Sequence, residues 1–238
     1  MAKDDKKVPA QTSSDGDVAA FLTKVAATPA PARGDGPGRL IFAMDATASR
    51  QPTWDRATHI QAQMFQETAA LGGLALQVAF YRGFGEFRVS SWQTDARRVV
   101  KLMTSVFCLA GKTQIAKVLR HAVNEAKAGK VNALVFVGDC MEEDVDALGA
   151  LAGELGLLGV PAFIFHEGED AIAAFAFQQI ARLSGGACCR FDSASPTALR
   201  DLLSAVAVYA AGGRKALEAL AGRRGGEVLR LTHQLKGG

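Results

Sequence analysis

Residues 40–49 read LIFAMDATAS, a run of five apolar residues followed by an acidic residue and two hydroxyl residues. A short apolar run of this kind is typical of a strand that is buried on both faces of a sheet. Asp45, Thr47 and Ser49 come directly after the run and alternate with alanines. Because ligands gather at the carboxyl ends of strands in open α/β sheets, this stretch predicts a buried strand with a polar site at its end.

Two further oxygen-bearing side chains lie at comparable places later in the chain. Asp139 follows the apolar run at residues 133–138, and Thr113 follows a glycine and a lysine in a loop that opens a predicted helix. Two carboxylates and three hydroxyls at one sheet edge form an all-oxygen shell, which suits Mg2+, with Mn2+ or Ca2+ also possible. The candidate metal ligands are Asp45, Thr47, Ser49, Thr113 and Asp139.

The types of donor also indicate what such a site does. We expect the neutral hydroxyls to bind the cation directly and the two carboxylates to act mainly through water, which leaves the cation under-neutralised. A carboxylate from outside the chain would then complete the shell. The site is therefore expected to recognise an Asp or Glu on a partner protein rather than to turn over a substrate.

Apolar runs and helical patterns alternate along the rest of the chain. Strands are predicted at residues 39–44, 74–81, 86–92, 132–137, 160–165 and 187–191. Helices are predicted at residues 53–71, 96–107, 115–127, 143–157, 170–183 and 196–210. Strands that alternate with helices of this length form right-handed crossovers and a mostly parallel sheet. The predicted fold class is α/β, a three-layer doubly wound sheet in which residues 86–92 form one antiparallel edge strand.

The two ends of the chain differ in composition from the middle. Residues 1–38 are rich in Ala, Pro, Ser, Asp and Gly and are predicted to be a flexible segment, within which residues 18–26 could form a short helix that docks on the domain or on a partner. Residues 39–211 form the predicted domain. Residues 212–238 form a basic, amphipathic tail with six Lys and Arg against two Glu. This tail either packs on the domain or docks on an acidic partner, nucleic acid or a membrane.

Composition narrows the class of protein. The chain has 238 residues, 49% of them apolar, and a net charge of +3, which is too small by itself to imply nucleic-acid binding. The four cysteines show no zinc-ligand spacing and are read as reduced thiols. Neither a secretory signal nor an apolar run long enough to span a membrane is found, so we expect a cytoplasmic location.

Three separated motifs resemble those of the von Willebrand factor type A (VWA) family. The run Asp45-Ala46-Thr47-Ala48-Ser49 is similar to the D-x-S-x-S of that family's metal-ion-dependent adhesion site, with a threonine in place of the first serine. Thr113 in its G-x-T loop, and Asp139 between Gly138 and Cys140, match the other two motifs. The resemblance covers about residues 39–210. It implies the fold, the cation site and, by analogy with intracellular members, a role as an adaptor in protein assemblies.

Other readings of the same residues stay open. An Asp followed by Thr and Ser is also a common helix N-cap pattern. His166, with the acidic residues at 167, 169 and 170, could shape a recognition face or simply cap the next helix. The alternative function is nucleic-acid binding through the basic tail, with affinity that falls steeply with salt.

An enzyme is not expected from this sequence. Thr47 stands where an aspartyl phosphatase would need its second carboxylate, and Val106 stands where the first glycine of a P-loop would be. The Rossmann glycine fingerprint and the G-x-S-x-G elbow are also missing. The chemistry of the sequence therefore favours a metal-dependent adaptor over a catalyst.

Overall fold

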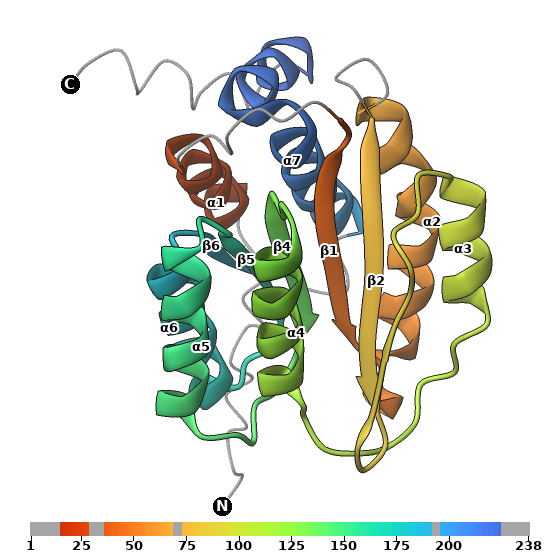
Figure 1. Ribbon diagram of the computed structural model, residues 1–238, viewed down its shortest axis with the longest axis vertical. Coiled ribbons are helices and arrows are strands. Elements are labelled where there is room, and N and C mark those ends of the chain that lie inside the picture. Colours follow the sequence, from red (N-terminus) through yellow and green to blue (C-terminus); the bar gives the residue numbers. More distant parts are fainter. Residues whose placement is uncertain (1–14, 29–35, 69–72, 192–195, 225–238) are drawn as a thin grey trace, which may run out of the picture.

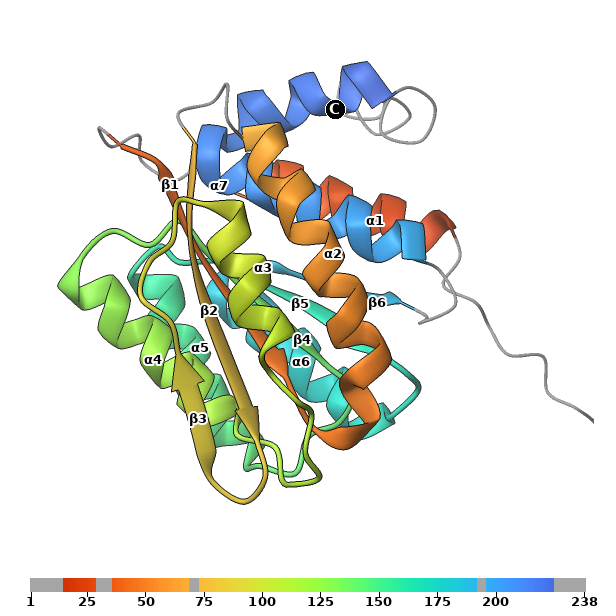
Figure 2. The same cartoon turned by 90° about the vertical axis from the view of Figure 1, so that its right-hand side faces the viewer.

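The computed structural model describes residues 15–28, 36–68, 73–191 and 196–224, which contain one six-stranded sheet in the order β3-β2-β1-β4-β5-β6. The strands are β1 Gly38–Asp45, β2 Leu74–Arg82, β3 Glu86–Val89, β4 Ala133–Gly138, β5 Ala162–Glu167 and β6 Ala187–Phe191. All neighbours pair in parallel except β3, which runs antiparallel to β2 at the edge. Figure 1 shows β1, β2 and β4 side by side, and Figure 2 shows the opposite directions of β2 and β3. The predicted fold class is confirmed.

Helices cover both faces of the sheet. They are α1 Asp15–Ala27, the short 3-10 turn η1 Ala48–Arg50, α2 Gln51–Thr68, α3 Ala96–Thr104, α4 Ile115–Ala128, α5 Val145–Leu157, α6 Ala171–Ser184 and α7 Pro196–Arg224. A hydrophobic core lies on each face of the sheet. In the first core, helices α1, α2, α3 and α7 pack on one face, and in the second core, helices α4, α5 and α6 pack on the other (Figure 2). Successive residues of β1 alternate between the two cores: Leu40 and Phe42 face the first, while Ile41 and Ala43 face the second. A strand buried on both faces must be apolar throughout, which is why its sequence reads as a continuous run.

Capping side chains decide where two of the helices begin. The Asp144 carboxylate accepts a hydrogen bond from the Ala147 N–H at 2.7 Å, and Asp170 accepts one from the Ala173 N–H at 2.6 Å. These bonds satisfy N–H groups that have no partner within the helix. The helix predicted at 143–157 therefore begins two residues later, and the capping interpretation of Asp170 is confirmed.

Helix α1 corrects the prediction that residues 1–38 are a flexible segment. Phe21, Leu22 and Val25 are buried in the first core, and the Phe21 ring meets those of Phe163 and Phe165 edge-on, with centroids 6.1 and 5.2 Å apart. Of the two docking alternatives for this helix, packing on the chain's own domain is the one observed. Residues 1–14 and 29–35, which hold most of the predicted linker, lie outside the described part of the chain.

The predicted boundary at residue 212 falls inside helix α7. The helix bends at Gly213, whose φ of 67° and ψ of −164° are not helical, and then continues to Arg224. Ala216, beyond the bend, is buried in the first core, so this part of the predicted tail packs on the domain. Residues 225–238 lie outside the described residues. Neither α7 nor any other helix in the described ranges is both long enough and apolar enough to cross a membrane.

Candidate metal centre

Two predicted ligands meet where the carboxyl ends of β1 and β4 lie side by side. Met44 pairs with Val137 in the parallel register, so Asp45 at the end of β1 and Asp139 just after β4 emerge at the same edge. An oxygen of each carboxylate and the sulfur of Cys140 all lie within 4.8 Å of one another. The parallel pairing thus converts a sequence separation of 94 residues into direct proximity.

The loop after β1 curls around the Asp45 side chain. The Thr47 N–H donates to Asp45 Oδ1 at 2.7 Å, and the Ser49 hydroxyl donates to Asp139 Oδ2 at 3.0 Å. Thr47 precedes the turn η1, but its side chain makes no capping hydrogen bond. The structure therefore brings Asp45, Thr47, Ser49 and Asp139 together, and the cap interpretation does not hold for Thr47.

Thr113 reaches the same edge from the loop between α3 and α4. Its hydroxyl accepts a hydrogen bond from the Glu142 N–H at 3.0 Å, and its own N–H donates to Glu142 Oε2 at 3.2 Å. This places Thr113 against the connection that carries Asp139. The same loop is tied to the Asp45 loop, since the Leu109 N–H donates to the Ala46 carbonyl at 2.9 Å. Hydrogen bonds thus link the Thr113 loop to the Asp45 loop and to the connection after Asp139. Ligation of a cation by any of the five residues stays a prediction.

Unpartnered oxygens show that the centre fits a cation. Asp45 Oδ2 and Asp139 Oδ1 are buried and have no hydrogen-bond partner among the described residues. A buried carboxylate oxygen without a partner is costly, and a cation between the two strand ends would offset that cost. No pattern in the sequence indicated that Cys140 belongs to this cluster. Its burial, and then the charges of Asp139 and Asp45, raise the pKa of its thiol to about 12. A thiol is also a softer ligand than the carboxylate and hydroxyl oxygens that Mg2+ prefers.

Ionisation of the Asp45 carboxyl group is unfavourable in its buried position. Its side chain is fully buried, and this loss of hydration raises its pKa from 3.8 to about 6, against the opposing effects of the Thr47 hydrogen bonds and the Arg50 charge. The ionised form is thus disfavoured without a nearby cation. A bound divalent ion would reverse that balance, because opposite charge favours the carboxylate.

We expect the cation-free protein to lose stability as the pH rises through the pKa of Asp45. The folded pKa of about 6 lies above the unfolded value of 3.8, so the folded state binds the proton more tightly, and this contribution is present below the unfolded pKa and lost above the folded one. The loss amounts to about 2 kcal/mol between pH 4 and pH 7. Urea unfolding in EDTA across this range would measure it, with Asp45→Asn as a control that lacks the titration. Parallel pH profiles for the two proteins would contradict the assignment.

Arg50, Thr53 and Glu167 form a buried group beside the centre that sequence reasoning missed. The Arg50 guanidinium bonds to Glu167 Oε2 and lies 3.6 Å from Asp139 Oδ2, while the Thr53 hydroxyl donates to Glu167 Oε2 at 2.6 Å. The sequence grouped Glu167 with Glu169, whereas the structure pairs Glu169 with Arg190 at 2.9 Å. Two features of the sequence could have indicated this group. Arg50 directly follows Ser49, and Glu167 ends a strand that reaches the same edge of the sheet.

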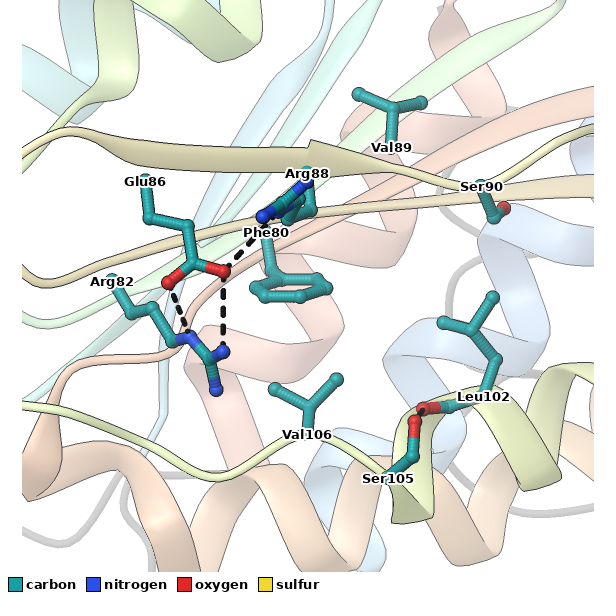
Figure 3. A pocket seen from close by; sticks show the side chains of 9 residues that line it. All are labelled: Phe80, Arg82, Glu86, Arg88, Val89, Ser90, Leu102, Ser105 and Val106. Atoms are coloured by element: carbon teal, nitrogen blue, oxygen red, sulfur yellow. Dashed lines mark hydrogen bonds and ion pairs between the residues drawn. The ribbon is translucent and has the colours of Figure 1, made fainter.

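A separate cavity of about 350 Å3 lies between β3 and the end of α3 (Figure 3). Phe80, Leu102 and Val106 form much of its apolar wall. Arg82 and Arg88 both donate to Glu86 at its rim, at distances of 2.9 to 3.2 Å. The three charged side chains of the lining therefore pair with one another.

Comparison with known proteins identifies solved structures that have a similar fold. No family model matches the chain, and no curated protein matches it. Among solved structures, it is similar to the SpRpn10 VWA domain, with a TM-score of 0.54 and 16% identity over 70% of this chain and 94% of that one. It is also similar to a von Willebrand factor type A protein from Catenulispora acidiphila, with a TM-score of 0.56 and 16% identity over 73% of this chain and 43% of that one.

A third similar structure is the PilB minor pilin from Streptococcus sanguinis, with a TM-score of 0.54 and 11% identity over 74% of this chain and 62% of that one. This chain thus spans less than two thirds of the pilin and of the Catenulispora protein. At these identities the likeness concerns the fold alone. The chain has a VWA-like fold, in which the Asp45 and Asp139 cluster lies at the carboxyl edge of the sheet.

Proposed function

We propose that this chain is a protein-interaction domain that grips an Asp or Glu of a partner through a divalent cation, Mg2+ by preference. The observation that carries the proposal is the pair of buried, unpartnered oxygens, Asp45 Oδ2 and Asp139 Oδ1, at the ends of adjacent strands. Thr47, Ser49 and Thr113 would supply the hydroxyl ligands. All three lie on loops that approach this pair.

The groups beside the centre favour recognition over catalysis. His166 pairs with Gly138 in the sheet register and is the histidine nearest to Asp139 in that register. Its ring is buried and packs edge-on against Phe177 at 5.2 Å, and burial lowers its pKa. A histidine enclosed in this way is poorly placed to exchange protons with a substrate. We therefore propose a binding domain and not an enzyme.

Exposed apolar side chains next to the centre support a protein as the partner. Phe84 and Phe107 are 85% and 71% exposed, and Leu109 is 48% exposed. Their two loops are joined to each other and to the Asp45 loop, since Leu109 bonds to both Gly83 and Ala46 through its backbone. Large apolar side chains held in solvent on hydrogen-bonded loops are typical of contact surfaces.

Calorimetric titration with MgCl2 or MnCl2 tests the proposal on chelator-treated protein. We expect one ion per chain, and an affinity that Asp139→Asn lowers by about tenfold or more, because the substitution removes one of two facing charges. Asp146→Asn, at an exposed position in α5, is the matched control and should bind like the unchanged protein. If the unchanged protein takes up no divalent cation at all, the proposed function is wrong.

The nucleic-acid alternative depends on the basic residues after Gly213, most of which lie at or beyond the end of the described chain. It stays a prediction. The two functions respond to different treatments: partner binding through the cation should be lost in EDTA, whereas phosphate binding by the tail should weaken steeply with added salt.

A further inference from the structure

We propose that Glu167 and Arg50 are positioning residues that set how strongly this centre binds its cation. This inference rests on the proposed function, because it concerns the same centre. Glu167 holds the Arg50 guanidinium at one oxygen of Asp139, and the other oxygen is left to face a cation. The Arg50 and Glu167 side chains would therefore tune the affinity of the centre for its cation.

The two oxygens of Asp139 have different surroundings. Oδ2 accepts the hydrogen bond from the Ser49 hydroxyl at 3.0 Å and lies 3.6 Å from Arg50 Nη1. Oδ1 is buried and has no hydrogen-bond partner within the described residues. Two groups on one oxygen fix the rotation of the carboxylate, so Oδ1 is held in place before any cation binds.

Glu167 fixes the position of the arginine. Arg50 is only 3% exposed, and its Nη2 bonds to Glu167 Oε2, which also accepts the hydrogen bond from the Thr53 hydroxyl at 2.6 Å. A buried guanidinium needs a paired charge, and its planar array of donors can serve two carboxylates at once. Glu167, at the end of β5, thus shares the Arg50 guanidinium with Asp139 and is itself held by Thr53 of α2. Without Glu167, Arg50 would have Asp139 as its acidic partner.

Because Arg50 and Glu167 carry opposite charges, Arg50→Met and Glu167→Gln should change the cation affinity in opposite directions. The Arg50 cation repels a second cation at the centre, and the Ser49 hydrogen bond still holds Asp139 Oδ2 when Arg50 is replaced, so Arg50→Met should strengthen cation binding. Glu167→Gln removes the negative charge that balances Arg50, so the Arg50 charge acts more strongly at Asp139 and cation binding should weaken. A purely structural role predicts that both substitutions weaken it.

The experiment is calorimetric titration of the full chain with MnCl2 after chelator treatment. We expect Glu167→Gln to lower the affinity by about tenfold and Arg50→Met to raise it by a few-fold. Glu169→Gln is the control, because Glu169 is 71% exposed and pairs with Arg190 away from Asp139. Thermal unfolding of each cation-free protein reports separately whether the fold is retained.

The outcomes separate the two proposals. If the unchanged protein binds Mn2+ and Glu167→Gln binds it equally well, the positioning role is wrong and the proposed function stands. The same conclusion follows if both variants fold and both bind more weakly. If the unchanged protein binds no cation, the proposed function fails first. Should Arg50→Met not fold, the comparison of Glu167→Gln with Glu169→Gln decides, since glutamine keeps an acceptor oxygen for Arg50 and Thr53.

Discussion

Replacing Phe21 with alanine is expected to lower the free energy of unfolding by about 3–5 kcal/mol, as for other large aromatic side chains in a core. The ring is 1% exposed and packs edge-on against Phe163 and Phe165 of β5, which lies between β4 and the edge strand β6. Its removal leaves a cavity under α1 that the sheet is too rigid to fill. Urea unfolding followed by circular dichroism measures the change.

The control for Phe21→Ala is Lys24→Ala, on the exposed side of the same helix. It should change stability by less than about 0.5 kcal/mol, because surface substitutions away from specific contacts are nearly neutral. If both variants unfold at the same urea concentration, α1 contributes nothing and residues 15–27 are an appendage after all. The expected result instead places them within the domain.

Replacing Gly111 with alanine is expected to weaken cation binding by about tenfold or more and to lower stability by about 1–3 kcal/mol. A Cβ at this position would lie 2.0 Å from the Gly83 carbonyl oxygen and 2.3 Å from its carbon. Both are backbone atoms held by the Lys112 N–H bond to the Gly83 carbonyl, so the two loops must separate. Thr113 follows two residues later and would move with its loop.

Gly153→Ala is the matched control for Gly111→Ala. A Cβ there meets no atom within 4 Å, and the residue lies inside helix α5. Alanine should raise stability by up to about 1 kcal/mol through its higher helix propensity and leave cation affinity unchanged. Titration and urea unfolding of the two variants side by side provide the measurement. Normal cation binding by a folded Gly111→Ala protein would exclude Thr113 as a ligand whose position matters.

Much of the fold was predictable because its signals are local. The strand at residues 187–191 has the predicted bounds, and the others differ from prediction by at most three residues at either end. Helix ends were less accurate where a side chain caps a different segment. The Glu143 carboxylate, for example, accepts a hydrogen bond from the Ala116 N–H at the start of α4 instead of starting α5. Helix α1 had the right period, but whether it packed on this domain depended on the Phe163 and Phe165 rings far along the chain.

Some residues of the candidate centre were also predictable from local sequence, and others were not. Asp45 and Asp139 were predictable as neighbours, since each follows a buried strand and parallel strands bring such positions to one edge. Cys140, Arg50 and Glu167 were not, because their contacts cross between elements. The Arg50 to Glu167 bond joins positions 117 residues apart, and no periodicity in the sequence reports such a pair.

The order of strands and helices, the two-sided burial of the sheet and the acids at its carboxyl edge were determined by the sequence alone, because hydrophobic period and composition act over a few residues. Only the tertiary structure decided which oxygen of Asp139 is engaged, which carboxylate holds Arg50, and that α1 closes one face. Those features depend on distances of a few ångströms between side chains from different elements. Such distances are set by the packing of the whole domain.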